Sequence, residues 1–270
     1  MELTIGTDPE VFVRDANGKY FSGHDLIPGT KHNPHPVKNG AIQVDGVALE
    51  FNTRPARTKE EFTQFISDVL VQLEAEYKTK RPDLTIAMTP TATFERDYFD
   101  ALPDEPKELG CTPDYNAYTG EQNEPPSTDE PFRTGSGHIH LGWTQWENPH
   151  DSAHFKVCCG LVRQLDAILY PASLLWDSDD RRRSLYGKIG AFRPKSYGVE
   201  YRPLSNAYLA DKSIQEIVFD IAHKATTDFF DGVIYEERER CVELVNRIRS
   251  GENLSSSEIG EYIDWMGWNI

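Results

Sequence analysis

The sequence has few cysteines and no long apolar segment. Its 270 residues include four cysteines, and they form neither a CxxC pair nor a set with zinc-ligand spacing. We therefore expect reduced thiols at all four: Cys111, Cys158, Cys159 and Cys241. No stretch approaches the roughly 20 consecutive apolar residues that a membrane helix requires, and the start, MELTIGTDPE, lacks the basic and apolar parts of a signal peptide. We expect no membrane association and a cytoplasmic location.

Positive charge and the common nucleotide-binding motifs are also scarce. Lys and Arg number 28 against 44 Asp and Glu, which gives a formal net charge of -16. This excess of acids makes nucleic acid or an anionic membrane an unlikely main partner, because such binding depends on neutralising phosphates. The sequence contains no P-loop, no GxGxxG, no GxSxG and no HExxH motif. A bound nucleotide would therefore need metal ions and arginines to hold its phosphates.

The overall composition is typical of a globular enzyme. Hydrophobic residues make up 38% of the chain, aromatic residues 11% and charged residues 27%, far from the signature of disorder. At this length we expect one domain, residues 1–270, around one core. Strand-rich segments separated by helices, with hairpin-like turns rather than regular βαβ units, predict an α+β domain. Its sheet should be curved and largely antiparallel, with helices on one face.

Periodicity and turn signals place the elements along the chain. Strands and turns fill residues 1–55, and a capping box at Thr58 and Glu61 opens a helix that should end near Arg81. A segment rich in Pro, Asp, Glu and Asn is expected to be a long surface loop at 103–131. Further strands are expected at 84–94, 133–143 and 188–204, and helices at 152–170, 213–230, 236–249 and 256–266.

Polar pairs two residues apart recur inside apolar strands. Residues at this spacing face the same side of a strand, so each pair puts two functional groups on one surface. The sequence contains four such pairs: Asp8 and Glu10, Glu50 and Asn52, His138 and His140, and Glu200 and Arg202. Carboxylates with a minority of histidines suit hard divalent cations such as Mg or Mn. One pair alone is more typical of a solvated sheet face, whereas four favour a metal-binding surface.

Two details of this pattern stay open. The HIH motif by itself is more often a satisfied polar pair than a ligand pair, although glycines flank it in GSGHIHLG and allow a close approach. Asp45 lies five residues before Glu50 and would face the other side of the strand unless Gly46 forms a bulge.

Positive charge is concentrated in one segment, residues 181–202. RRRSLYGKIGAFRPKSYGVEYR carries seven Lys or Arg and one acid. The planar arginine group suits phosphate or carboxylate oxygens, and lysine supplies a mobile charge, so this segment favours an anion site such as a triphosphate beside metal ions. The alternative is a basic surface stripe that balances nearby acids.

These residues carry a family resemblance. The sequence resembles the phage-type COOH-NH2 ligases, or amidoligases, of the glutamine synthetase and γ-glutamylcysteine synthetase superfamily. The resemblance spans most of the chain and depends on an ordered set of motifs: GTDPEVF, IPGTKHNPHP, QVDGVALEFNTRPA, GCTPDYNAY, RTGSGHIHLGW and YGKIGAFRPKSYGVEYRPLSN. Each motif alone is unspecific, and the ordered set is specific.

The resemblance implies a fold and a set of site residues. The fold is a glutamine synthetase-like catalytic domain with a saddle-shaped antiparallel sheet, an ATP end and a substrate end, bridged by two or three Mg or Mn ions. The implied metal ligands are Asp8, Glu10, Glu50, His138 and Glu200. The implied catalytic residues are Arg202, Glu200 and Arg193, and the implied ATP contacts are Lys188, Arg193, Lys195 and His140.

The implied activity is an ATP- and Mg-dependent carboxylate-amine ligase that forms an amide or peptide-like bond through an acyl phosphate. Its partners would be small-molecule or peptide carboxylates and amines, in the host cytoplasm if the chain is phage-encoded. Their identities, the oligomeric state and any lid role of 103–131 stay open. Two alternatives remain: a phosphotransferase of the guanido-kinase type, and a catalytically inactive ligand-binding module on the same fold.

Overall fold

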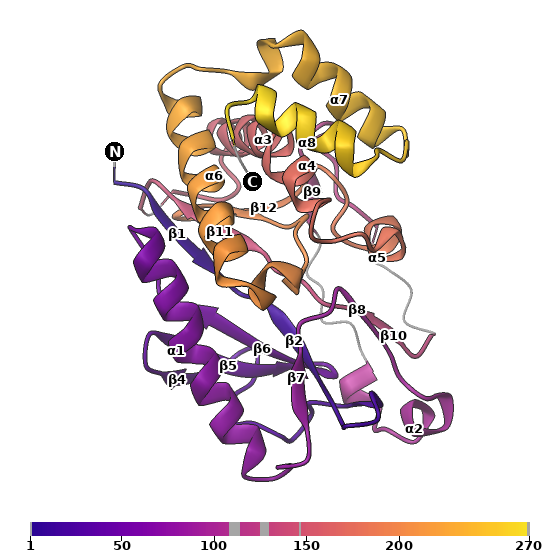
Figure 1. The fold of residues 1–270 in the computed structure, drawn as a ribbon. Coiled ribbons are helices and arrows are strands. Elements are labelled where there is room, and N and C mark those ends of the chain that lie inside the picture. The colour runs from indigo at the N-terminus through magenta and orange to yellow at the C-terminus, as the bar shows by residue number, and fades with distance from the viewer. Residues whose placement is uncertain (1, 108–113, 125–129, 146, 269–270) are drawn as a thin grey trace.

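The computed structural model describes residues 2–107, 114–124, 130–145 and 147–268. Its strands form two main antiparallel sheets and one two-stranded ribbon, and its long helices pack against the two sheets (Figure 1). This arrangement confirms the predicted α+β class with curved, antiparallel sheets.

The first sheet has five strands. Their order is β1 (Thr4–Thr7), β11 (Ile139–Gly142), β13 (Gly198–Tyr201), β12 (Ala191–Lys195) and β9 (Tyr115–Asn116). Every neighbouring pair is antiparallel, and the register places His140 opposite Glu200 and Glu200 opposite Arg193. Residues directly opposite each other on neighbouring strands point to the same face. Three polar side chains from three strands therefore lie in one row.

The second sheet has six strands. Their order is β3 (Tyr20–Phe21), β2 (Glu10–Arg14), β6 (Ala48–Thr53), β5 (Gly40–Asp45) and β4 (His35–Val37), and β7 (Thr85–Ala87) also pairs with β2. Glu10 lies opposite Glu50, and Gln43 lies opposite Glu50 on the other side. A separate ribbon pairs β8 (Thr91–Thr93) with β10 (Phe132–Thr134).

The two sheets join where β1 passes into β2. Only Asp8 and Pro9 separate the two strands. Proline has no backbone N–H to donate to a ladder, and the chain changes sheets here: Glu10 N donates to Ser136 O at 3.0 Å, while Ile5 still bridges to Ala56. Asp8 consequently stands at the boundary between the sheets.

Eight α-helices are found among the described residues. They are α1 (Lys59–Lys78), α2 (Arg96–Asp100), α3 (Ser152–Asp166), α4 (Leu169–Ser173), α5 (Asp180–Leu185), α6 (Lys212–Phe230), α7 (Glu239–Arg249) and α8 (Ser256–Trp265). Short 3-10 helices occur at Glu105–Lys107, Asn206–Ala210 and Tyr235–Glu237. Helix α1 packs on β5 and β6, α6 packs on α1 and α3, and α3 packs on β12 and β13.

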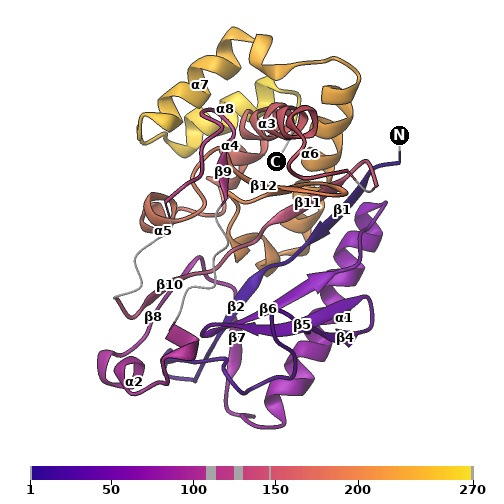
Figure 2. The same ribbon diagram turned by 180° about the vertical axis from the view of Figure 1, so that it is seen from behind.

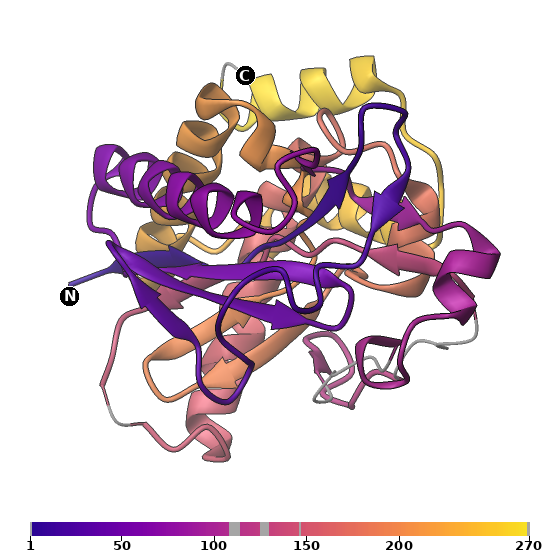
Figure 3. The ribbon, with the colours of Figure 1, turned by 90° about the horizontal axis from the view of Figure 1, so that it is seen from below.

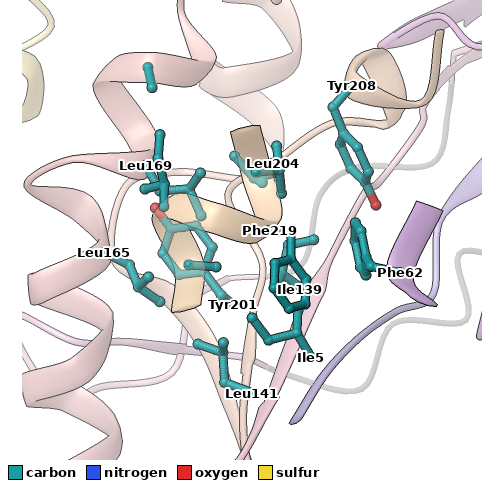
Figure 4. Close-up of a cluster of buried hydrophobic side chains, with 14 of the residues drawn as sticks. Ile5, Phe62, Ile139, Leu141, Leu165, Leu169, Tyr201, Leu204, Tyr208 and Phe219 are labelled. Atoms are coloured by element: carbon teal, nitrogen blue, oxygen red, sulfur yellow. The ribbon is translucent and has the colours of Figure 1, made fainter. Parts of the chain in front are cut away.

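One face of the sheets is covered by helices, and the other carries the polar pairs. Figure 1 shows α1 and α6 in front of the strands, and Figure 2 shows β2, β5 and β6 from the opposite side. In the view from below, α1 lies over β5 and β6 (Figure 3). On the covered face Ile139, Leu141 and Tyr201 are fully buried (Figure 4). Since side chains alternate along a strand, their neighbours His138, His140 and Glu200 face the other side.

The element boundaries differ from the sequence predictions in several places. Pro171 does not end the long helix: α3 stops at Asp166, and Pro171 lies inside α4 in the first turn, where proline is tolerated. The strands expected at 84–94 and 133–143 are each broken, the first into β7 and β8 and the second into β10 and β11. The segment expected to be an irregular loop contributes β9, the edge strand of the first sheet.

Other predicted elements are confirmed. Thr58 caps α1 by accepting from Glu61 N, although the helix ends at Lys78, before Arg81. Ser255 and Glu258 form a capping box at the start of α8. The three described cysteines are free and buried, while Cys111 lies outside the described residues. Within the described part of the chain, no helix is both long and apolar enough to cross a membrane.

Candidate active site

Asp8 lies at the centre of the polar face, between the two histidines. Its Oδ1 is 2.9 Å from His140 Nε2 and 3.2 Å from His138 Nδ1. Burial pushes the pKa of Asp8 up, but the charges of His140 and His138 outweigh it and hold the pKa well below its usual value. Asp8 is therefore an anion at neutral pH.

Glu200 is the shared anion of three cations. Lys195 Nζ lies 2.6 Å from Glu200 Oε2, Arg193 Nη1 lies 3.3 Å from Oε1, and Arg202 Nη1 donates to Oε1 at close range. The Glu200 side chain is 0% exposed. Burial alone would raise its pKa, but Arg202 and the two histidines lower it strongly. The cluster assembles because Arg193 and Lys195 are two residues apart on β12, so both face the same side as Glu200 on the neighbouring strand β13.

Arg202 reaches a residue that the sequence analysis did not single out. Its Nε donates to Asp114 Oδ2 at 3.0 Å, and its Nη2 donates to the hydroxyl of Tyr186. Burial lowers the pKa of Arg202, but Tyr186, Glu200 and Asp114 raise it above its ordinary value. Asp114 belongs to the GCTPDYNAY motif and precedes β9, so the pairing of β9 with β12 brings it to the site.

A second group of carboxylates lies on β2, β5 and β6, and we call it the acidic ledge: Glu10, Glu50 and Asp45. Glu10 and Glu50 face each other across the strands, and Asp45 lies on the same face because β5 and β6 form a tight hairpin through Gly46 and Val47. Glu10 Oε2 accepts from Ser136 N at 3.1 Å, and Glu50 Oε2 accepts from Gln43 Nε2 at 2.6 Å.

The acidic ledge is compensated more weakly than Glu200: Lys31 Nζ lies 4.0 Å from Asp45 Oδ2, whereas three cations surround Glu200. Burial and then the charge of Asp45 raise the pKa of Glu10 to about 7. Burial and then the charges of Asp8, Asp45 and Glu10 raise the pKa of Glu50 well above its ordinary value. Because these carboxylates repel one another, a bound cation would relieve them.

Three side chains have the geometry of a metal site. Ligand atoms of Asp8, His140 and Glu200 all lie within 4.8 Å of one another. Asp8 Oδ1 and His140 Nε2 are only 2.9 Å apart, yet neither buried atom makes a hydrogen bond of good geometry to any described residue. An oxygen-rich set with one imidazole suits Mg or Mn. The residues present therefore fit a divalent cation, and the acidic ledge could hold more.

Most of the site residues predicted from the sequence come together here, but not all. Five of them contact Asp8 or Glu200: His138, His140, Arg193, Lys195 and Arg202. Glu10 and Glu50 join them on the acidic ledge. Lys188 instead lines a different cavity of about 890 Å³, between α5 and the loop from α7 to α8.

The first arginines of the basic segment also turn elsewhere. Arg181 pairs with Glu130, and Arg183 pairs with Asp177 and Asp180. Arg182 is fully buried and donates to the carbonyls of Pro203 and Leu204 at 2.8 and 2.6 Å. The basic segment 181–202 therefore has two roles: its first arginines anchor α5, and its later basic residues line the site.

Comparison with known proteins adds one family. Residues 129–231 match the family model described as "Phage phiEco32-like COOH.NH2 ligase-type 2". The predicted amidoligase resemblance is confirmed over this segment. The match covers less than half of the chain. The amidoligase segment includes these site residues: His138, His140, Arg193, Lys195, Glu200 and Arg202.

The other comparisons are weaker. Among solved structures, a bifunctional glutathione synthetase from Pasteurella multocida is similar to the chain, with a TM-score of 0.44 and 11% sequence identity. The alignment covers 98% of this chain and 47% of that chain, so this chain spans about half the length of that protein. No curated protein sequence matches the chain.

Proposed function

We propose that the protein is an ATP-dependent, Mg- or Mn-dependent carboxylate-amine ligase. The observation that carries the proposal is one polar face with two unlike halves: cations gathered around Glu200, and the acidic ledge beside Asp8. The cations suit the phosphates of a nucleotide, and the carboxylates suit metal ions and an incoming amine. The amidoligase match over 129–231 supports the same reaction class.

The proposed reaction joins an acid to an amine in two steps. A carboxylate oxygen of the acid attacks the γ-phosphorus of ATP, and the bond from this phosphorus to the β,γ-bridging oxygen breaks. The products of this step are ADP and an acyl phosphate. The amine nitrogen then attacks the acyl carbon, the C–O bond to phosphate breaks, and inorganic phosphate leaves with an amide as product. A bound ammonium gives one proton to a carboxylate of the acidic ledge before its nitrogen attacks, and the nitrogen of the new amide gives a second proton to water after phosphate has left.

The chain's own residues supply electrostatic stabilisation. Arg193, Lys195 and Arg202 already converge on one anion, Glu200, so their N–H groups can follow negative charge as it moves from the γ-phosphate to the bridging oxygen. A divalent cation held by Asp8, His140 and Glu200 would neutralise further phosphate charge. The carboxylates of the acidic ledge can bind the amine in its ammonium form.

The proposal also covers the fold and the number of domains. We take residues 1–270 as one catalytic domain of glutamine synthetase type, because the two sheets share the β1–β2 chain and a single polar face. ATP phosphates would lie over β12 and β13, and the amine over β2 and β6.

The experiment is a screen of acid and amine pairs with ATP and Mg, in which ADP, phosphate and the coupled product are measured. A ligase releases ADP and phosphate only when both substrates are present. Arg202→Ala should lower the rate by about 100-fold or more, since removing one donor to a developing charge has effects of this size. Arg240→Ala, on the exposed surface of α7, is the matched control and should keep wild-type activity.

Three results would contradict the proposal. A stable phosphorylated product without an amine would indicate a phosphotransferase. Calorimetry that detects no Mg-dependent ATP binding would indicate an inactive module. Near-normal turnover by Arg202→Ala would remove this arginine from the mechanism.

A further inference from the structure

A cavity at the edge of the five-stranded sheet lies apart from the groups around Asp8 and Glu200, and we call it the lateral pocket. It has a volume of about 890 Å³ and is lined by residues of β9, α4, α5, α7, α8 and the loop between α7 and α8. These elements gather in the upper half of the view in Figure 1. None of the described residues that contact Asp8 or Glu200 lines it. Cavities of this size commonly hold small molecules.

The loop between α7 and α8 forms one wall of the lateral pocket and is held by ion pairs. Gly251, with φ of +81°, ends α7 and lets Glu252 N donate to Arg247 O at 3.1 Å. Arg247 in turn binds two carboxylates: its Nε donates to Glu252 Oε1 and its Nη2 donates to Glu258 Oε1, both at 2.9 Å. This wall is therefore formed before a ligand binds, which lowers the cost of binding.

The acidic residues of the lining already have basic partners. Arg183 Nη2 lies 3.5 Å from Asp177 Oδ1, and its Nη1 lies 3.6 Å from Asp180 Oδ1. Glu252 pairs with Arg247, as described above. The negative charge of the lateral pocket is therefore offset within the protein itself.

Two basic residues of the lining have no such acidic partner. Lys188 and Arg249 are both exposed, and neither forms a salt bridge with a described residue. Arg249 lies over the ring of Tyr118, with its Cζ 4.0 Å from the ring centroid. Burial raises the pKa of Asp166 to about 7, and the charge of Arg249 is one of the effects that oppose this rise. The positive charge that remains at the lateral pocket favours an anionic ligand, although the whole chain carries a net charge of -16.

Apolar side chains make up much of the remaining lining. They are Tyr170, Leu174, Ile189, Ile248, Leu254 and Ile259. Tyr170 and Ile259 are buried, and the other four are partly buried against the core. A ligand that covers them would remove apolar surface from water. The lateral pocket therefore combines an apolar surface with two cations that have no salt bridge.

We propose that the lateral pocket binds a small organic anion. The apolar body of this ligand lies against the six apolar side chains, and Lys188 and Arg249 hold its carboxylate or phosphate group. Lys188 then belongs to a second site, away from the ATP phosphates that the family resemblance implies for it. This inference goes beyond the proposed ligase activity and does not depend on it.

The first test uses anilinonaphthalene sulfonate (ANS), a fluorescent probe with aromatic rings and one sulfonate, with the full chain free of metal and nucleotide. Lys188→Ala and Arg249→Ala should each weaken ANS binding by about 2- to 5-fold, the effect expected from one exposed ion pair. High salt should reduce the difference from wild type. Lys156→Ala is the matched control and should leave binding unchanged, since this exposed lysine on α3 also lacks a salt bridge with a described residue and lies outside the lining.

Near-ultraviolet circular dichroism shows whether each variant keeps its tertiary packing, because ANS also binds loosely packed chains. Equal effects at all three positions would overturn the proposal, and so would the absence of ANS binding to the folded wild type.

The second test displaces ANS with compounds that share a phenyl ring: phenylpropionate, phenyl phosphate and the neutral phenylpropanol. Displacement by either anion supports the proposal, and the stronger of the two identifies the anionic group. The alcohol should need a concentration about 5-fold higher, because it lacks the charge that Lys188 and Arg249 recognise. Failure of both anions, or equal displacement by the alcohol, would contradict the inference. Displacement by ATP but by neither phenyl anion would assign the lateral pocket to the nucleotide and would contradict it as well.

Discussion

The two halves of the polar face treat their carboxylates in opposite ways. On the five-stranded sheet Glu200 is buried among Arg193, Lys195 and Arg202, and its pKa is lowered. On the six-stranded sheet Glu10 and Glu50 face each other with Asp45 beside them, and the pKa values of Glu10 and Glu50 are raised. Both halves lie on antiparallel strands, where Glu200 is fully buried and Glu10, Glu50 and Asp45 are partly exposed. The difference is whether the chain itself supplies the counter-charge.

This contrast distinguishes a carboxylate whose charge the fold compensates from carboxylates whose charge it compensates weakly. A buried carboxylate with its own cations keeps its charge and fixes those cations for an incoming phosphate, and removing it would leave them unpaired. A buried carboxylate without them costs stability, and the strain is relieved by a cation from outside. The raised pKa values of Glu10 and Glu50 make the acidic ledge the part of the polar face that a bound cation would stabilise most.

The largest effect is expected from Glu200→Gln. This change leaves buried cations without their shared anion, and breaking a buried pair in this way costs about 3–5 kcal/mol. Denaturant unfolding of the metal-free protein at pH 7 measures the free energy of unfolding. Because the pKa of Glu200 is depressed in the folded state, the difference from wild type should shrink as pH falls below the 4.5 of an ordinary glutamate.

The matched control for Glu200→Gln is Glu216→Gln, on the partly exposed side of α6, where the single pair with Lys212 is solvent-accessible. It should change the free energy of unfolding by less than about 0.5 kcal/mol. An equally small effect at Glu200 would mean that the three cations do not depend on it.

A smaller effect of opposite sign is expected from Glu10→Gln. The folded-state pKa of Glu10 is about 7, above the ordinary 4.5, so wild-type stability from this group is lost as pH rises from 4.5 through 7. The amide cannot ionise and can still accept from Ser136 N. We expect the metal-free variant to be about 1–2 kcal/mol more stable than wild type at pH 8, and the gain to vanish near pH 4. A loss of stability at pH 8 would contradict the contrast between the halves.

Much of this site was predictable from two-residue spacing. His138 and His140 share a face because Ile139 between them is in the core, and the same holds for Glu200 and Arg202 around Tyr201. The α+β class and the polar face opposite the helices follow from the same alternation. Periodicity also located α1 and its cap at Thr58.

Two-residue spacing could not place the residues whose position depends on where the backbone turns. Asp8 and Glu10 looked like one strand pair, but the chain changes sheets at Pro9, so each joins a different half of the site. Asp45 was uncertain because 41–52 was taken as one strand, whereas the Asp-Gly signal marks a hairpin. Asp114 and Tyr186 come from segments without strand periodicity, and only tertiary packing brings them to Arg202.

A crystal of the protein soaked in Mn²⁺ would test the metal assignment most directly, through the anomalous signal of the metal. We expect a Mn²⁺ peak between the side chains of Asp8, His140 and Glu200, the three groups whose ligand atoms already lie within 4.8 Å of one another. A map with no peak at these side chains at saturating Mn²⁺, in crystals where the site is open to solvent, would contradict it.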